Sequence, residues 1–209
     1  MYYHYVMHDK RFKYLVGIDE VGRGPLAGPV AVGAFLIPID NLVKAKKLFR
    51  KVKESKQLSA EKREKWFAIT QQAKKDGLID FCVTFKSEKV IDGRGLSFAV
   101  GSALEASLAG LRLGGSKISP QHSKVLLDGG LKAPVEYLDQ KTIIKGDEKE
   151  MVIALASICA KVLRDRKLIK LAKRYPLYGF EMHKGYGTKS HYKAIKENGM
   201  CAIHRRSFL

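Results

Sequence analysis

The stretch that decides the fold is YLVGIDEVGRGPLAGPV, residues 14–30. A short apolar run leads straight into two adjacent carboxylates, Asp19 and Glu20, and these are followed at once by a Gly-Arg-Gly turn. A strand that buries its side chains and ends on two negative charges is costly unless a cation lies beside them. A divalent metal ion is the simplest such cation. Because glycine has no Cβ, the turn also lets the main chain approach a ligand closely.

Residues 22–27, GRGPLA, also fit the glycine-rich fingerprint of dinucleotide-binding folds. That fingerprint requires a helix to follow, with its N-terminus aimed at a pyrophosphate. Here residues 29–37 form an apolar run with β-branched residues, which predicts a second strand. The carboxylates of Asp19 and Glu20 would also repel a pyrophosphate. We therefore favour a metal site over a nucleotide cofactor.

The composition indicates a globular protein whose 209 residues suit one domain with an appended subdomain. The hydrophobic content of 45% argues against disorder, and the formal net charge of +18 attracts polyanions or anionic membranes. No apolar run is long enough to span a bilayer, and the N-terminus lacks a signal-peptide pattern. Nucleic acid is therefore the better partner, and no membrane is expected. Charge alone is also compatible with a basic protein whose lysines are simply solvated.

The cysteines indicate a reducing compartment. Cys82, Cys159 and Cys201 are scattered and form no CxxC pair, which predicts free thiols, a cytoplasmic location and no structural zinc. Cys82 and Cys159 lie in apolar segments and are expected in the core.

Strands and helices are predicted to alternate, which indicates an α/β layer architecture. Strands are expected as a pair within residues 14–38, joined by the glycine turn, and then over residues 79–85, 125–129 and 142–147. Helices are expected over residues 60–76, 96–113 and 148–174. The first helix has Ser59 as its expected N-cap and Trp66, Ile69 and Ala73 as its apolar positions. The polar, aromatic and basic tail over residues 177–209 predicts a small helical subdomain.

Three of the predicted strands end in acidic residues: Asp19 with Glu20, Asp128, and Asp147. Adjacent residues of a strand face opposite sides, so Asp19 and Glu20 can converge only where the strand is ending. Strand ends are where open α/β sheets collect ligands. Carboxylates gathered there would repel one another, and oxygen-seeking cations such as Mg²⁺ or Mn²⁺ would relieve the repulsion.

Each of these carboxylates also has a structural interpretation. Asp128 precedes two glycines and could form a turn. Asp147 could be a helix N-cap with Glu150 as its capping-box partner, or both a cap and a ligand. Asp165 competes as a fourth carboxylate, although between two arginines in a helix it is more typical of a surface ion pair.

The chain resembles the ribonuclease HII family from Tyr14 to Phe208. Besides the stretch quoted above, the motifs that carry the resemblance are SKQLS at residues 55–59, LDG at 127–129, KGD at 145–147, ASICAKVLRD at 156–165, HKGYGT at 183–188 and HRRSF at 204–208. The related ribonuclease HIII family lacks the arginine of the glycine motif, which is present here as Arg23. The resemblance implies the ribonuclease H fold, an α/β fold with a five-stranded mixed sheet and flanking helices. It implies a catalytic domain over residues 1–175 and a C-terminal helical cap over residues 176–209 that contributes to substrate binding.

The resemblance also implies the catalytic residues and the cofactor. The family's metal ligands match Asp19, Glu20, Asp128 and Asp147 in this sequence, and two Mg²⁺ or Mn²⁺ ions are expected during catalysis. The implied activity is hydrolysis of the RNA strand of RNA/DNA hybrids and cleavage on the 5′ side of single ribonucleotides in duplex DNA. The products would carry 3′-hydroxyl and 5′-phosphate ends, as in removal of ribonucleotides or primers. The enzyme is expected to be a monomer.

The substrate contacts implied by the resemblance lie in the glycine turn and in the second half of the chain. The main chain of Gly22, Arg23 and Gly24 would read the 2′-hydroxyl, which alone separates RNA from DNA locally, and Arg23 would also contact phosphate. Tyr186 would pack on the neighbouring deoxyribose, although it could be an ordinary loop aromatic. Candidate phosphate contacts are Lys56, Lys184, Arg205 and Arg206. A solvated basic surface is the competing interpretation for the last two.

The chain departs from the family's pattern in two motifs. The usual DSKKLS is ESKQLS here, with Glu54 and Gln57, so one lysine that would contact phosphate is absent. The usual Asn-Ile-Leu before the second helix is Arg94-Gly95-Leu96, so a polar role there does not carry over.

Two other functions were weighed against a ribonuclease. A non-catalytic duplex-binding module is disfavoured because four carboxylates would weaken binding beside DNA. Another metal-dependent nuclease of the same fold, such as a junction resolvase, is disfavoured by the Gly-Arg-Gly turn and by Tyr186.

Overall fold

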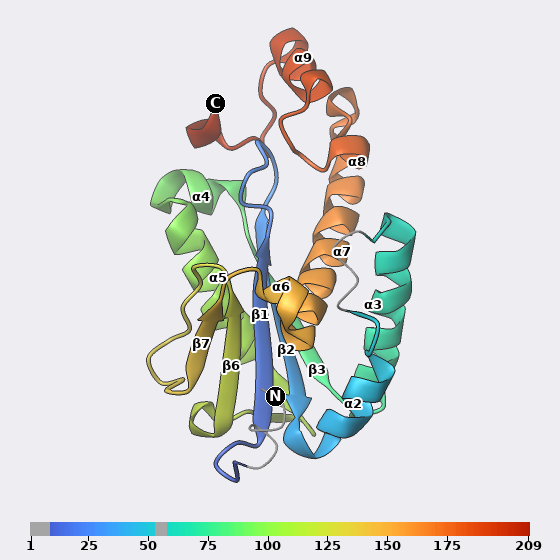
Figure 1. Cartoon of the computed structure of the whole chain (residues 1–209). Helices are drawn as coiled ribbons and strands as arrows, with labels where there is room; N and C mark the ends of the chain where they lie inside the picture. Colours follow the sequence, from blue (N-terminus) through green and yellow to red (C-terminus); the bar gives the residue numbers. More distant parts are fainter. Residues whose placement is uncertain (1–8, 53–57) are drawn as a thin grey trace.

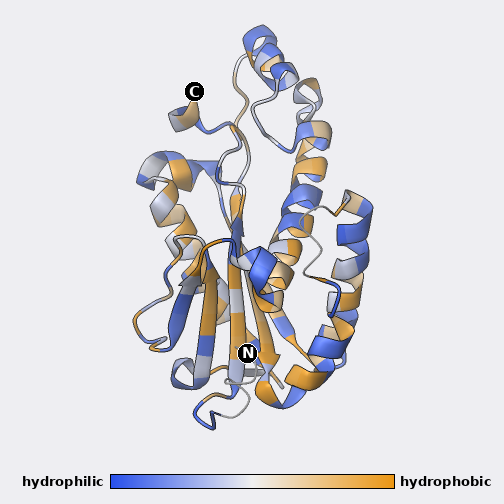
Figure 2. Cartoon of the chain, in the orientation of Figure 1, coloured by the Kyte–Doolittle hydropathy of each residue, from blue (hydrophilic) through white to orange (hydrophobic). Residues whose placement is uncertain are grey.

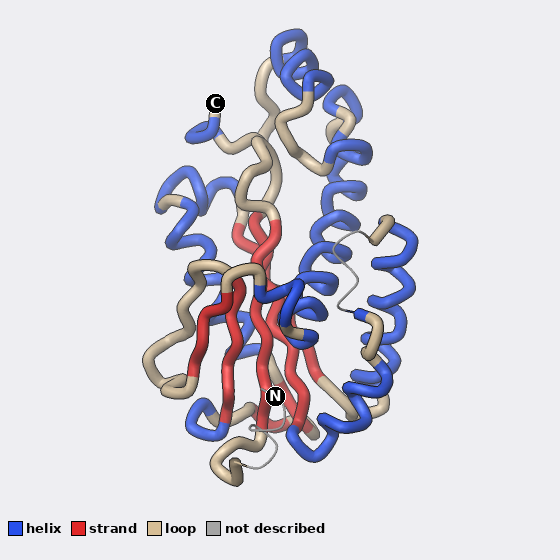
Figure 3. The backbone as a smooth tube through the Cα atoms, viewed as in Figure 1, coloured by secondary structure: helices blue, strands red, loops and turns tan. Residues whose placement is uncertain are grey.

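The computed structural model describes residues 9–52 and 58–209 of the chain. Its centre is a five-stranded sheet with the strand order β3-β2-β1-β6-β7 (Figures 1 and 3). The strands are β1 (Tyr14–Val21), β2 (Val30–Pro38), β3 (Asp80–Lys86), β6 (Ser123–Asp128) and β7 (Gln140–Ile143). β1 pairs with β2, and β2 with β3, in antiparallel fashion, whereas β6 runs parallel to both β1 and β7. The predicted mixed sheet of five strands is therefore confirmed.

Helices cover both faces of this sheet. They are α2 (Leu42–Leu48), α3 (Ala60–Lys75), α4 (Glu88–Arg94), α5 (Leu96–Gly110), α6 (Gly146–Lys149), α7 (Met151–Arg174), α8 (Phe180–His183) and α9 (Lys189–Asn198). Short connecting elements are η1 (Ile39–Asn41), β4 (Arg112–Leu113), β5 (Ser116–Lys117), η3 (Pro120–His122), η4 (Pro176–Tyr178) and η5 (Arg206–Phe208). No helix in the described ranges is long and apolar enough to cross a membrane.

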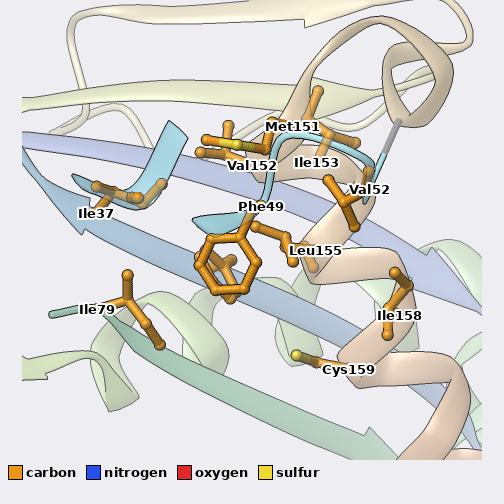
Figure 4. Close-up of a cluster of buried hydrophobic side chains, with 14 of the residues drawn as sticks. Ile37, Phe49, Val52, Ile79, Met151, Val152, Ile153, Leu155, Ile158 and Cys159 are labelled. Carbon is orange, nitrogen blue, oxygen red and sulfur yellow. The ribbon is translucent and has the colours of Figure 1, made fainter. Parts of the chain in front are cut away.

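Alternation along the strands divides the core into two layers. In β1, Leu15 belongs to a buried cluster with α2, α3 and α7, and its neighbour Val16 belongs to a second cluster with α5. The central strands β1 and β2 are accordingly hydrophobic along most of their length, whereas the edge strand β7 is largely hydrophilic (Figure 2). Figure 4 shows part of the first layer, including Phe49, Leu155 and Cys159. Burial of this kind supplies the main favourable free energy of folding.

Helix α7 lies unusually close to the central strands. A Cβ at Gly17 of β1 would be 2.2 Å from the carbonyl carbon of Val152, and a Cβ at Gly33 of β2 would be 2.4 Å from the carbonyl oxygen of Ala156. Glycine at these two positions therefore permits the helix to approach the sheet. Since Gly33 is the register partner of Asp19, the same approach brings the following residue, Ser157, to Asp19.

Several predicted elements differ from the structure in their bounds. The strand predicted over residues 142–147 ends at Ile143, and Asp147 lies in the short helix α6. The helix predicted over residues 96–113 ends at Gly110, the helix predicted from residue 148 starts at Met151, and α4 was not predicted. Ser59 is confirmed as the N-cap of α3, where its side chain accepts a hydrogen bond from the N–H of Lys62.

The buried face of α3 is also rotated from the predicted one. Phe67, Thr70 and Ala73 are buried, whereas Ile69 is 37% exposed. Thr70 can be buried because its hydroxyl donates to the carbonyl oxygen of Trp66 at 2.9 Å.

All three cysteines are free thiols, as expected. Cys159 is fully buried, and its burial raises the pKa of the thiol far above the ordinary value. Cys82 is only partly buried.

The C-terminal elements form a helical cap at the far end of α7, beyond the glycine turn (Figure 1). A third buried cluster joins Phe180 and Ile203 of the cap to Leu168 of α7 and to Ala27 of the turn. The domain boundary at residues 175 and 176 remains a prediction.

Three histidines lie together inside the cap, two of them joined by a hydrogen bond and the third stacked on one of these. The N–H of Cys201 donates to Nδ1 of His204 at 2.9 Å, Nε2 of His204 lies 3.0 Å from Nε2 of His191, and Nδ1 of His191 lies 2.9 Å from the carbonyl oxygen of Tyr186. The ring of His183 stacks on that of His191 with centroids 4.4 Å apart. These partners fit neutral rings, each with one donor and one acceptor nitrogen.

Candidate active site

Asp19 is a buried carboxylate near the end of β1. Its relative exposure is 5%, and its Oδ1 accepts a hydrogen bond from the N–H of Glu20 at 2.8 Å. The parallel pairing of β1 with β6 ends at Ile18 and Leu127, while the pairing with β2 continues to Val21. Asp19 and Glu20 are thus still within the strand, but they lie where its edge toward β6 has opened.

The predicted carboxylates influence one another electrostatically. Burial raises the pKa of Asp19 to about 8; a side-chain hydrogen bond with Ser157 opposes this shift, and the charges of Asp128, Glu20 and Asp147 add to it. Burial also raises the pKa of Glu20, against the lowering effect of Arg23 and with a further contribution from Asp128. The fold therefore gathers the other three acidic residues around Asp19. A site of this kind favours a compensating cation.

Asp128 and Asp147 are joined through one turn. Oδ1 of Asp128, the last residue of β6, accepts a hydrogen bond from the N–H of Gly146 at 2.5 Å. Asp147 follows directly in α6 and is buried. Its predicted role as an N-cap is wrong, because Lys145 occupies that position of α6 and Glu150 occupies it in α7.

The donor set fits a hard divalent cation. All four side chains offer carboxylate oxygens, the ligands that Mg²⁺ and Mn²⁺ prefer. Oε2 of Glu20 is buried and accepts no hydrogen bond from the described part of the chain, so a cation would satisfy it. Within residues 9–52 and 58–209, no three His, Cys, Asp or Glu side chains already stand in the geometry of a metal centre. The four carboxylates thus lie near one another, but they are not already arranged as ligands around one point.

Asp165, the competing fourth carboxylate, has cationic partners of its own. Its side chain pairs with Lys161 at 2.8 Å and with Arg63 at 3.9 Å. The charge of Asp147, by contrast, helps to raise the pKa of Asp19. The geometry therefore favours Asp147 over Asp165 as a member of the site.

The glycine loop, which we define as residues 22–29, follows the acidic pair. Arg23 is half-exposed, and its guanidinium reaches back to Oε1 of Glu20 at 3.3 Å. Gly22 has φ +94°, and a Cβ there would be 2.2 Å from Nε of Arg164. Only glycine can therefore occupy this position beside the buried arginine.

Arg205 does not fit its predicted role as a phosphate contact. Its side chain is fully buried and donates hydrogen bonds to the carbonyl oxygens of Gly22, Arg23 and Gly28. A guanidinium that is occupied by three main-chain acceptors and shielded from solvent cannot also contact a phosphate. Sequence reasoning missed this because an arginine in a basic tail is usually at the surface.

The remaining predicted substrate residues have accessible side chains, apart from Lys56, which lies outside the described residues. Tyr186 is 41% exposed, and Nζ of Lys161 lies 5.8 Å from its ring centroid. Lys184 has φ +53°, and its ammonium group donates to the carbonyl oxygen of Glu181. Arg206 is exposed at the C-terminal end, where its N–H donates to Asp92 of α4 at 3.0 Å. Glu54 and Gln57, the two departures in the SKQLS motif, also lie outside the described residues.

Sequence reasoning missed two residues that the structure places against the predicted site. Ser157 of α7 makes a side-chain hydrogen bond with Asp19, and Arg164 of the same helix is fully buried beneath the glycine loop. Both belong to the ASICAKVLRD motif, so the quoted motif was the available signal. Its spacing did not show which members would turn toward the acidic residues.

Comparisons with known proteins agree with the fold. A family model described as Ribonuclease HII matches residues 16–209. A ribonuclease HII from Endomicrobium trichonymphae is 39% identical over 201 residues, covering 96% of this chain and 88% of that protein. One from Caldicellulosiruptor bescii is 40% identical over 198 residues, covering 95% and 87%. The crystal structure of ribonuclease H2 from Pyrococcus horikoshii OT3 superposes with a TM-score of 0.71 at 27% identity, covering 93% of both chains.

Proposed function

Because this chain belongs to the ribonuclease HII family and is therefore a nuclease, we propose that it cuts on the 5′ side of single ribonucleotides in duplex DNA and hydrolyses the RNA strand of RNA/DNA hybrids. The products would carry a 3′-hydroxyl and a 5′-phosphate. The observation that carries the proposal is the gathering of Glu20, Asp128 and Asp147 around the buried carboxylate of Asp19. The reaction would serve removal of ribonucleotides or primers by a cytoplasmic monomer.

The four carboxylates are the groups that would hold divalent metal ions. Two Mg²⁺ or Mn²⁺ ions, when bound, would supply an activated water and stabilise the leaving oxygen. Asp19 would act together with the other carboxylates, since the charge of each of them adds to its raised pKa. Ser157 would fix the orientation of Asp19, and Gly146 would fix that of Asp128 through its N–H.

The glycine loop and the exposed ring of Tyr186 would select the substrate. The main chain of Gly22, Arg23 and Gly24 would hydrogen-bond the 2′-hydroxyl, and Tyr186 would pack on the next deoxyribose. Arg23, Lys56, Lys184 and Arg206 would contact phosphates, which positions a duplex without specifying its sequence. The net charge of +18 supports binding to a duplex of any sequence.

A defined substrate tests the proposal. The protein is incubated with a labelled DNA duplex that holds one ribonucleotide, with Mg²⁺, with Mn²⁺ or with a chelator, and the product ends are mapped. Cleavage at the 5′ side of the ribonucleotide, dependent on the metal and absent on an all-DNA duplex, is the expected result. Binding without cleavage would favour the duplex-binding module, and cleavage of four-way junctions alone would favour a resolvase.

A further inference from the structure

We propose that Arg164 and Arg205 are positioning residues that hold the glycine loop and the Tyr186 loop at a fixed spacing, and thereby set the preference for a ribonucleotide followed by a deoxyribonucleotide. We define the Tyr186 loop as residues 184–188. The proposal rests on the proposed function, in which the glycine loop reads the 2′-hydroxyl and Tyr186 contacts the next sugar. In this proposal, two buried arginines determine the distance between the glycine loop and Tyr186.

Arg205 holds the glycine loop near both of its ends. Its Nη2 donates to the carbonyl oxygen of Gly22 at 2.6 Å, its Nη1 to that of Arg23 at 2.8 Å, and its Nε to that of Gly28 at 2.9 Å. One planar guanidinium therefore fixes three carbonyl groups, two of them in the turn that would read the ribose. The N–H groups of that turn are held in orientation as a consequence, because each peptide unit is planar.

Arg164 joins the second half of the loop to the Tyr186 loop. Its Nε donates to the carbonyl oxygen of Pro29 at 2.9 Å, and its Nη2 lies 3.4 Å from that of Ala27. Its Nη1 donates across to the carbonyl oxygen of Lys184 at 3.2 Å. The same side chain packs beside Gly22, and its Cζ lies 6.0 Å from the ring centroid of Tyr186.

Main-chain hydrogen bonds complete the connection between the two loops. The N–H of Leu26 donates to the carbonyl oxygen of Gly185 at 2.8 Å, and the N–H of Gly28 donates to that of Ile203 at 2.8 Å. The N–H of Arg205 donates to the carbonyl oxygen of Leu26 at 2.8 Å. The residue before Tyr186 is thus bonded to the loop that the two arginines hold.

Both guanidiniums are fully buried, and neither forms an ion pair with a carboxylate of the described residues. Burial and the like charge of Arg164 lower the pKa of Arg205 to about 10. Burying a charged guanidinium costs free energy because it loses its hydration, and here the hydrogen bonds to main-chain carbonyl groups offset that cost. Lysine could not replace either side chain, because an ammonium group on a flexible stem cannot meet several acceptors in one plane.

The first test needs no substrate. Amide hydrogen exchange is measured in the wild type, in Arg164→Lys and in Arg205→Lys. The control variant is Arg174→Lys, at an exposed position of α7, the helix that also carries Arg164. The N–H groups of Leu26 and Gly28 are expected to exchange about tenfold faster in the first two variants, with strand amides unchanged. Unchanged exchange at the loop would overturn the proposal.

The second test separates positioning from binding. On a duplex with one ribonucleotide, Arg164→Lys and Arg205→Lys are expected to lower kcat about tenfold through misplacement of the sugar, with KM nearly unchanged because the surface phosphate contacts remain. On a continuous hybrid the loss should be smaller. A raised KM with unchanged kcat would mean that the arginines contact phosphate. Equal losses of kcat on both substrates would mean that they support the structure as a whole and not the choice of substrate. Either result overturns the proposal. If the wild type itself fails to cut at one ribonucleotide, the proposed function and the specificity fail together, and the exchange experiment still decides whether the arginines hold the loops.

Discussion

Oδ1 of Asp128 lies 2.5 Å from the main-chain nitrogen of Gly146 and accepts its hydrogen bond. The carboxylate at the end of β6 therefore also fixes the turn that presents Asp147. A substitution of Asp128 removes the negative charge alone if the new side chain can still accept the hydrogen bond from Gly146. It removes both the charge and the hydrogen bond if the new side chain offers no acceptor.

Asp128→Asn is expected to abolish cleavage with little change in stability, because the amide oxygen can still accept from Gly146. Duplex binding should persist or tighten, since a negative charge near phosphates is removed. Asp128→Ala should in addition lower the free energy of unfolding by about 1–3 kcal/mol, the cost of the unsatisfied N–H. Cleavage assays, filter binding and denaturant unfolding measure the three effects. Substantial activity of Asp128→Asn with Mg²⁺ would contradict the four-carboxylate site.

Asp147→Asn should lower activity strongly, whereas Asp165→Asn should have a mild effect. Asp147 contributes to the shifted pKa of Asp19, and Asp165 pairs with Lys161 and Arg63 instead. Loss of those ion pairs should lower stability by about 1 kcal/mol at most. Activity and Tm are measured together on both variants. The reverse ranking would assign the fourth ligand to Asp165.

Tyr186→Ala should reduce cleavage of a ribonucleotide followed by deoxyribose more than cleavage of a continuous hybrid. Its exposed ring is the surface that would pack on the deoxyribose. Tyr186→Phe is the matched control, because it keeps the ring and removes only the hydroxyl. Equal losses on both substrates in Tyr186→Ala would mean that the tyrosine is structural.

Acid should weaken the cap through its histidines. Burial lowers the pKa of His191 to about 4, and burial also lowers the pKa of His204, so both rings are neutral in the fold. Unfolded histidine titrates near about 6.5, so the stability supplied by the neutral rings is present above that pH and is lost as pH falls toward 4. Protonation would also place two N–H donors face to face between His191 and His204.

The raised pKa of Asp19 acts in the opposite direction, since a carboxyl that binds its proton more tightly in the fold stabilises the protein as the pH falls. The expected result is therefore a difference between two proteins: from pH 7 to pH 5 the wild type should lose about 1–2 kcal/mol of stability relative to His191→Gln, whose side chain cannot gain a proton, while the effect of Asp19 is common to both. An equal pH dependence in the variant and the wild type would exclude this histidine as the cause.

Alternation and glycine placement in the sequence were enough to predict the β1–β2 pair and the long helix that became α7. They also made Asp128 and Asp147 candidates for a site with Asp19, but the choice of these two residues needed the resemblance to the ribonuclease HII family. The position of Asp147 was predicted less well, because Lys145 takes a left-handed conformation as the N-cap of α6, which begins three residues after β7 ends. The buried face of α3 was misjudged because Thr70 satisfies its hydroxyl within its own helix. The roles of Arg164 and Arg205 could not be predicted, since all of their acceptors in the glycine loop are carbonyl groups more than a hundred residues away in the chain.

The tie between Arg205 and Gly22 spans 183 residues, which separates two stages in the folding of this protein. The β1–β2 pair is local and can form early, whereas the glycine loop between those strands has to wait for residues 203–205. Contacts between distant segments form slowly because their loop-closure entropy must be overcome first. During refolding, sheet structure should therefore return before cleavage activity does. The glycine loop, which directly follows the first two carboxylates in the sequence, is therefore expected to be among the last segments to reach its final conformation.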